Sequence, residues 1–185
     1  MPILSQVKSN LINPDEVLRR VGVKAGMQVG DLGCGNGYFT LAAARLVGDS
    51  GRVFAVDVLK SCLDTVRREA ERNNLLNIVT VWSNLEIVGA TNIPEASLDL
   101  VIIKNSLYQS TNRQNFIQEA ERLLKNNGKM LIIEWIKHPT PIGPPVSDRI
   151  SEDDLKQILS TFPNLEIIDN FDPGKYHYAY LIQKK

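Results

Sequence analysis

The sequence predicts an α/β fold with a doubly wound, mostly parallel sheet, and two features of its pattern lead to this prediction. Short apolar runs alternate with amphipathic stretches between residues 13 and 136, which is the arrangement of βαβ units in a parallel sheet. After residue 150, two strand-like segments follow one another with no helix between them. We expect these last two strands to pair as an antiparallel hairpin.

Each expected strand is a short apolar run that ends at turn-forming residues. The strands are Met27–Asp31, Arg52–Asp57, Ile78–Trp82, Leu98–Ile103, Lys129–Ile136, Leu165–Ile168 and Tyr176–Gln183. Turns are expected at Asn126-Asn127-Gly128 and at Asp172-Pro173-Gly174, because these residue types favour turns.

Helices are expected where apolar residues recur at helical spacing. They cover residues 14–21, Tyr38–Val47, Ser61–Asn74, Phe116–Leu124 and residues 151–159. Asn13 and Ser151 have side chains that can cap the first and the last of these helices. The segment Lys137–Pro145 contains four prolines and a glycine, so it is expected to be a loop.

Length and composition indicate one soluble domain over residues 1–185, with 43% hydrophobic residues. The 21 basic and 21 acidic residues cancel, and residues 1–92 and 93–185 are each balanced to within one charge, so no basic surface for nucleic acid is indicated. No apolar run approaches the ~20 residues of a membrane-spanning helix, and Met1-Pro2-Ile3-Leu4 lacks the features of a signal peptide. We therefore expect a cytoplasmic protein. Cys34 and Cys62 are too few for a zinc site or a disulfide framework.

The most informative segment is Asp31-Leu32-Gly33-Cys34-Gly35-Asn36-Gly37, which joins the first expected strand to a helix. Glycines at alternate positions allow a sharp turn and leave no Cβ between the backbone and a ligand. The helix that follows presents free N–H groups to that ligand. Dinucleotide sites have the spacing G-x-G-x-x-G, whereas the third glycine here comes one residue earlier. This spacing disfavours a nicotinamide-dependent reductase.

The D-x-G-x-G-x-G pattern resembles the first motif of the class I S-adenosylmethionine (SAM) dependent methyltransferases, and the resemblance extends over residues 11–183. It implies a seven-stranded sheet with one antiparallel C-terminal strand, and SAM as the cofactor. Glu134-Trp135 and Gly143-Pro144-Pro145 are similar to segments of small methyltransferases related to the quinone-biosynthesis enzymes.

The resemblance places a polar side chain at the end of each strand that contacts SAM. Asp31 would accept hydrogen bonds from the ammonium group of SAM, and Asp57 would bind both ribose hydroxyls. Val58 would pack on the adenine, and the amide of Asn84 would meet the adenine amino group, although the family usually has an acid there. The other expected cofactor residues are Gly33, Cys34, Gly35, Asn36, Gly37, Leu85 and Asn105.

The acceptor side is open to more than one interpretation. Tyr108 and His138 are the expected catalytic residues, with a packed aromatic ring and an exposed loop histidine as the alternatives. Arg149 would either hold an anionic acceptor or cap the next helix, and we favour the cap. Residues 1–12, an N-terminal arm, and residues 137–150, a lid-like loop, are expected to close over the site.

The sequence thus predicts a SAM-dependent methyltransferase with a small-molecule acceptor. Methylation of nucleic-acid amino groups is disfavoured, because Lys104-Asn105-Ser106-Leu107 differs from the Asn/Asp-Pro-Pro-aromatic pattern of those enzymes. Arsenite methylation is disfavoured by the small number of cysteines. The alternative is a SAM-binding module or a subunit that needs a partner, because the chain offers few segments with which to enclose an acceptor.

Overall fold

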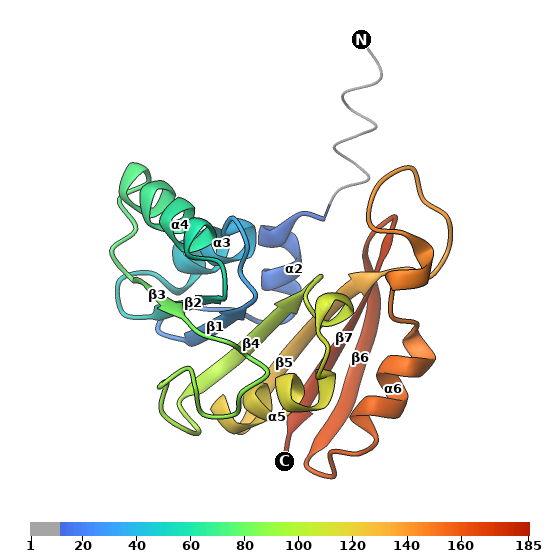
Figure 1. Cartoon of the computed structure of the whole chain (residues 1–185). Helices are drawn as coiled ribbons and strands as arrows, with labels where there is room; N and C mark the ends of the chain where they lie inside the picture. Colours follow the sequence, from blue (N-terminus) through green and yellow to red (C-terminus); the bar gives the residue numbers. More distant parts are fainter. Residues whose placement is uncertain (1–11) are drawn as a thin grey trace.

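The computed structural model describes residues 12–185, and a seven-stranded sheet with helices on both faces forms its centre (Figure 1). The strands are β1 Gln28–Leu32, β2 Arg52–Asp57, β3 Ile78–Trp82, β4 Leu98–Lys104, β5 Leu124–Trp135, β6 Leu165–Gly174 and β7 His177–Lys184. The α-helices are α2 Pro14–Arg20, α3 Tyr38–Val47, α4 Lys60–Arg72, α5 Arg113–Leu123 and α6 Glu152–Leu159. Two short 3₁₀ helices, η1 Leu107–Gln109 and η2 Val146–Asp148, were not predicted.

The strand order is β3-β2-β1-β4-β5-β7-β6. Strands β1 to β5 pair in parallel, and β7 lies antiparallel between β5 and β6. The predicted fold, with one reversed strand near the C-terminus, is therefore confirmed. The direction of winding changes between β1 and β4, and open α/β sheets bind ligands in the crevice at the carboxyl ends of such strands.

Helices α2, α3 and α4 cover one face of the sheet, and α5 and α6 cover the other (Figure 1). On the first face, Leu18 of α2 and Phe39 of α3 belong to the cluster that contains Val29 of β1. On the second face, Ile117 of α5 and Leu155 of α6 pack in the cluster that fills the opposite side. Because both faces are buried, the central strands read as nearly continuous apolar runs.

Two predicted turns lie within strands. Helix α5 ends at Leu123 and β5 begins at Leu124, so Asn126-Asn127-Gly128 lies in the irregular first part of β5. Strand β6 continues to Gly174, so the predicted turn at Asp172-Pro173-Gly174 is wrong. Because β6 is an edge strand with register shifts, it tolerates a proline that cannot donate a hydrogen bond.

Both predicted helix caps are confirmed. The side-chain oxygen of Asn13 accepts the N–H of Asp15 at 3.1 Å at the start of α2. At α6, Ser151 Oγ accepts the N–H of Asp154 at 3.1 Å, and the Asp154 carboxylate accepts the N–H of Ser151 at 3.3 Å. None of the helices in residues 12–185 is long and apolar enough to cross a membrane.

Removing the α6 cap should destabilise the protein without affecting the site. We expect Ser151→Ala to lower the free energy of unfolding by about 1 kcal/mol, because the N–H of Asp154 in the first turn loses its partner. Urea denaturation followed by circular dichroism measures this change. The matched variant Ser61→Ala lies in α4, which has no side-chain cap, and should change the value by less than about 0.5 kcal/mol. Equal stability of the two variants would contradict the capping role.

Candidate active site

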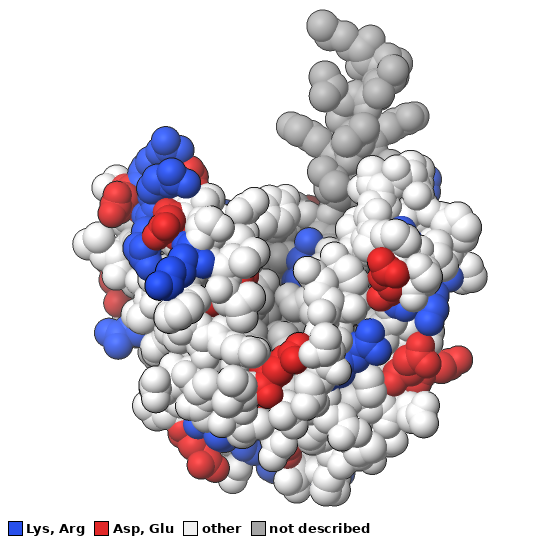
Figure 2. Space-filling view, in the orientation of Figure 1, with Lys and Arg blue, Asp and Glu red and all other residues white. Residues whose placement is uncertain are grey.

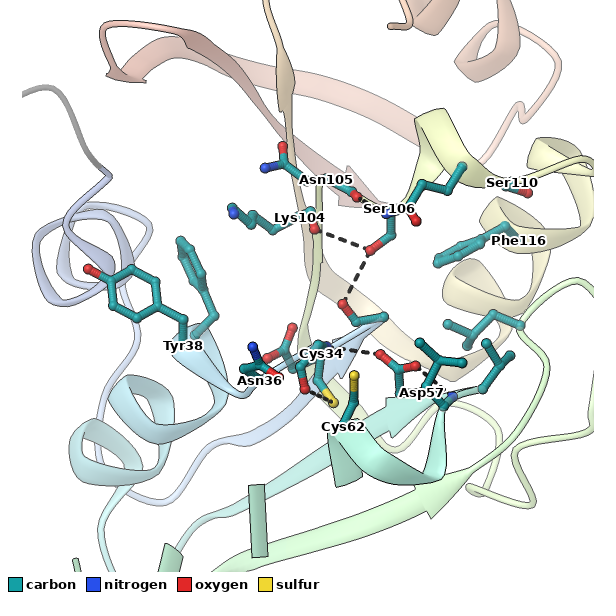
Figure 3. A pocket seen from close by; sticks show the side chains of 18 of the residues that line it. Cys34, Asn36, Tyr38, Asp57, Cys62, Lys104, Asn105, Ser106, Ser110 and Phe116 are labelled. Atoms are coloured by element: carbon teal, nitrogen blue, oxygen red, sulfur yellow. Dashed lines mark hydrogen bonds between the residues drawn. The ribbon is translucent and has the colours of Figure 1, made fainter. Parts of the chain in front are cut away.

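A cavity of about 760 Å³ opens at the carboxyl ends of the parallel strands (Figure 3), a size typical of small-molecule sites. All of the predicted cofactor residues except Gly37 line this cavity: Asp31, Gly33, Cys34, Gly35, Asn36, Asp57, Val58, Asn84, Leu85 and Asn105. The predicted cofactor residues thus come from four strand ends that lie at one edge of the sheet.

The turn between β1 and α3 requires glycine at two positions where the backbone approaches other elements. Gly33 has φ +76°, and a side chain there would collide with Ser106, which follows β4. Gly37, at the start of α3, has φ +81°, and a Cβ would come within 2.8 Å of Val66 on α4. The glycines thus allow the turn to lie close to β4 and to α4.

Asp57, at the end of β2, holds the glycine turn. Its carboxylate oxygens accept the N–H of Gly35 at 2.9 Å and the N–H of Leu59 at 2.8 Å. A carboxylate oxygen can accept more than one hydrogen bond, so Asp57 can still accept from two hydroxyls of a ribose. The assignment of the ribose to Asp57 stays a prediction.

Asp31, at the end of β1, is a buried carboxylate that lines the cavity and accepts the hydroxyl of Thr40 at 2.5 Å. Burial raises the pKa of Asp31 to about 6, despite the hydrogen bond from Thr40, which favours the charged form. A cationic ligand group would relieve this cost, because it stabilises the carboxylate. The ammonium group of SAM fits this requirement.

A cluster of polar and aromatic side chains around Asn105 lies where β4, β5 and β7 meet. Asn105 has the unusual φ of +54°, and the amide orientation that satisfies its neighbours turns its oxygen toward three donors. It accepts from Lys104 Nζ at 2.9 Å, from His177 Nε2 at 3.2 Å and from Trp135 Nε1 at 3.2 Å. The Trp135 and His177 rings pack against one another with centroids 4.0 Å apart and planes tilted by 36°.

Burial shifts the pKa values of the ionisable side chains in and around this cluster. Burial, with the positive charges of Lys104 and Arg149, lowers the pKa of His177 to about 3, so its imidazole is neutral at physiological pH. Burial raises the pKa of Glu134 to about 7, although its carboxylate accepts the N–H of Leu107 at 2.8 Å. Burial also lowers the pKa of Lys104, against the opposing effect of Asp31 and Glu134.

Neither predicted catalytic residue lines the cavity. Tyr108, in η1, packs against the core cluster. His138 is exposed in the loop after β5. The catalytic role of both residues stays a prediction. Lys104, Trp135 and His177 line the cavity instead. His177 could have been found from the sequence, because a reversed strand begins at the edge where its parallel neighbours end.

Arg149 has a different role from the predicted helix cap, which Ser151 provides. Its buried guanidinium donates to the carbonyl oxygens of Ile136 at 3.0 Å, His138 at 2.8 Å and Pro144 at 2.7 Å. It therefore fixes the path of the loop after β5. That residues 137–150 act as a lid stays a prediction, and residues 1–11 of the predicted arm lie outside the described part of the chain.

The loop after β3 is also tied to its surroundings. The side-chain oxygen of Asn84 accepts the N–H of Glu86 at 2.9 Å. The Glu86 carboxylate accepts the hydroxyls of Ser110 at 2.8 Å and Thr111 at 2.7 Å, which lowers its pKa and joins the loops after β3 and β4. The proposed contact between Asn84 and the adenine stays a prediction. In residues 12–185, no three His, Cys, Asp or Glu side chains gather as metal ligands would.

The glycine turn, the buried acid at its start and the acid at the end of β2 fit SAM, and with the fold they define a class I SAM-dependent methyltransferase. The sequence matches the methyltransferase domain family over residues 23–165, and the chain belongs to that family. The family assignment confirms SAM as the cofactor and sets aside the nicotinamide-dependent reductase.

Similar proteins include ubiquinone/menaquinone biosynthesis C-methyltransferases. The protein from Hahella chejuensis is 35% identical over 127 residues, which are 65% of this chain and 48% of that protein. The one from Shewanella sp. is 32% identical over 158 residues, or 85% and 59% of the two chains. This chain thus spans about half the length of the relatives it matches. A solved structure of a SAM-dependent methyltransferase from Aquifex aeolicus has the same fold, with a TM-score of 0.87, 24% identity and 95% and 91% coverage.

Cofactor affinity should fall in acid because Asp31 must be ionised to bind an ammonium group. We expect the dissociation constant for S-adenosylhomocysteine to rise on the order of tenfold as the pH falls from about 7 to about 5. In this range Asp31, with its pKa near 6 in the free protein, becomes protonated. Calorimetric titration measures the trend. Asp31→Asn should bind weakly with little pH dependence, and a flat profile for the wild type would contradict the assignment.

Asp57 should contribute directly to cofactor binding. We expect Asp57→Ala to weaken binding of S-adenosylhomocysteine about tenfold to a hundredfold, the effect of losing charge-assisted hydrogen bonds. Calorimetry measures the affinity, and Asp49→Ala, the loss of an exposed acid outside the cavity, is the matched control. An unchanged dissociation constant in Asp57→Ala would remove this residue from the site.

Proposed function

We propose that this chain transfers the methyl group of SAM to a small aromatic acceptor such as a quinol, and that it does so without a partner protein. The observation that carries the proposal is the set of aromatic rings at one cavity. Tyr38, Phe116, Trp135 and His177 all line it, beside the residues that fit SAM. The names of the relatives, which refer to ubiquinone and menaquinone biosynthesis, support a quinol-type acceptor.

The contribution of the protein is mainly to orient the acceptor and to exclude water. Bound SAM supplies an electrophilic methyl group, so a correctly aligned nucleophile is the main requirement. The Trp135 and His177 rings, whose planes are tilted by 36° to one another, both line the cavity and offer aromatic contacts to an acceptor ring. Asn105 fixes both rings through their N–H groups, so these rings are already held in place before an acceptor arrives.

The distribution of charge favours a small molecule over a nucleic acid. Lys and Arg side chains are interspersed with acids on the face shown in Figure 2. The basic residues of α4 illustrate this, because Arg67 pairs with Asp64 and Arg72 pairs with Glu69. Their charge is partly neutralised within the helix, so α4 offers no continuous basic surface for a phosphate backbone.

The proposal predicts turnover by the purified chain alone. With SAM and a short-chain naphthoquinol under reducing, anaerobic conditions, we expect S-adenosylhomocysteine to form together with a product heavier by one methyl group. Mass spectrometry detects both. The quinone form should not react, because the oxidised ring is a poor nucleophile, and Asp57→Ala should slow the reaction.

The alternative from the sequence predicts a different result. A SAM-binding module or partner-dependent subunit would bind S-adenosylhomocysteine but would methylate no quinol by itself. Activity that appears only after a second protein is added would replace the present proposal with that alternative.

A further inference from the structure

Lys104 is an unusual cation in this structure. Among residues 12–185 it is the only Lys or Arg that lines the cavity, and Figure 3 shows its side chain extending from the end of β4 into that space. Among residues 12–185, no carboxylate lies within salt-bridge distance of it. By contrast, the partly buried Lys125 pairs with Asp99 at 2.6 Å.

The side chains that act on Lys104 come from β1, β5 and β7 and from Asn105, which follows β4. Asn105 offers its amide oxygen at 2.9 Å, a neutral partner that leaves the charge uncompensated. Asp31 on β1 and Glu134 on β5 act from farther away and raise the pKa of Lys104, while burial lowers it. His177 on β7 is neutral because burial lowers its pKa. A half-buried ammonium group without a direct counter-ion favours binding of an anion.

The aromatic side chains of the cavity indicate what carries that anion. Trp135 and His177 pack against one another at a 36° tilt and both donate to Asn105, which also accepts from Lys104. A planar ring placed against them would therefore lie within reach of the ammonium group. This arrangement combines an apolar surface for a ring with one point charge for a substituent of that ring.

We propose that Lys104 is a specificity-determining residue that selects aromatic acceptors carrying an anionic oxygen, either a phenolate or a carboxylate. The inference rests on the proposed function, because it concerns the acceptor of the same site. A phenol that binds in this way releases its proton to water, and Lys104 remains an ammonium ion throughout.

Two chromogenic or ultraviolet-absorbing probes test the inference without any turnover. 4-Nitrophenol and 4-nitrobenzoate are titrated into protein saturated with S-adenosylhomocysteine, and the absorption of nitrophenolate reports its ionisation. We expect the bound phenol to ionise at lower pH than the free phenol. Lys104→Met and Lys104→Gln should each weaken binding of the preferred anion about tenfold to a hundredfold. The two probes together distinguish a phenolate from a carboxylate.

Matched measurements separate this inference from the proposed function. Lys60→Met removes a lysine whose ammonium lies 3.9 Å from the centroid of the exposed Trp82 ring, and it should leave anion binding unchanged. Both Lys104 variants should bind S-adenosylhomocysteine within about threefold of the wild type, which shows that they are folded. Equal anion binding by wild type and both variants, or no binding of either anion by the wild type, would overturn the inference and leave methyl transfer intact. Failure of the wild type to bind S-adenosylhomocysteine would overturn both.

Discussion

The close approach of the β1–α3 turn to the end of β4 is the constraint on which the rest of the site depends. Strands β1 and β4 pair in parallel, so their carboxyl ends reach the same edge of the sheet. Gly33 leaves room for Ser106, whose hydroxyl donates to the Gly33 carbonyl at 3.2 Å. Ser106 directly follows Lys104 and Asn105, so a side chain at position 33 would displace residues that line the cavity. One glycine thus allows the β1–α3 turn and the end of β4 to line the same cavity.

The sequence predicts the fold, and the residues that gather at the ends of β1 to β4, because their signals are local. The glycine spacing and an acid at a strand end, such as Asp57, can be recognised within a few residues, and parallel pairing then brings the strand ends together. The cluster around Asn105 is set by contacts distant in sequence. Asn105 and His177 are 72 residues apart, and only the insertion of the reversed strand β7 beside β5 brings them together. Tyr108 also follows a strand end, but its ring packs against the core cluster and does not line the cavity, and its catalytic role stays a prediction.

Without a ligand, ionisation of buried carboxyl groups in and near the cavity lowers the stability of the folded protein. Burial raises the pKa of Asp31 from 3.8 to about 6, so its contribution to stability is complete below its unfolded-state pKa and is lost as the pH rises through about 6. The loss is on the order of 2–3 kcal/mol by the usual conversion of pKa shifts. Glu134, with its pKa near 7, acts in the same direction, but it is buried and does not line the cavity. A cationic ligand group beside Asp31 recovers part of that free energy as affinity.

Two cations near the cavity, the buried Arg149 and the half-buried Lys104, have different roles. Arg149 donates hydrogen bonds to the carbonyl oxygens of Ile136, His138 and Pro144, so it stabilises the loop after β5. Lys104 has one neutral acceptor, Asn105, and faces the cavity. A guanidinium with five donors can satisfy several carbonyls at once, whereas an ammonium group at the end of a flexible stem acts as a point charge. Arg149 is held by these carbonyl oxygens, whereas the charge of Lys104 remains available to a ligand. This charge lies next to Trp135 and His177, so an acceptor would contact the charge and the aromatic rings together.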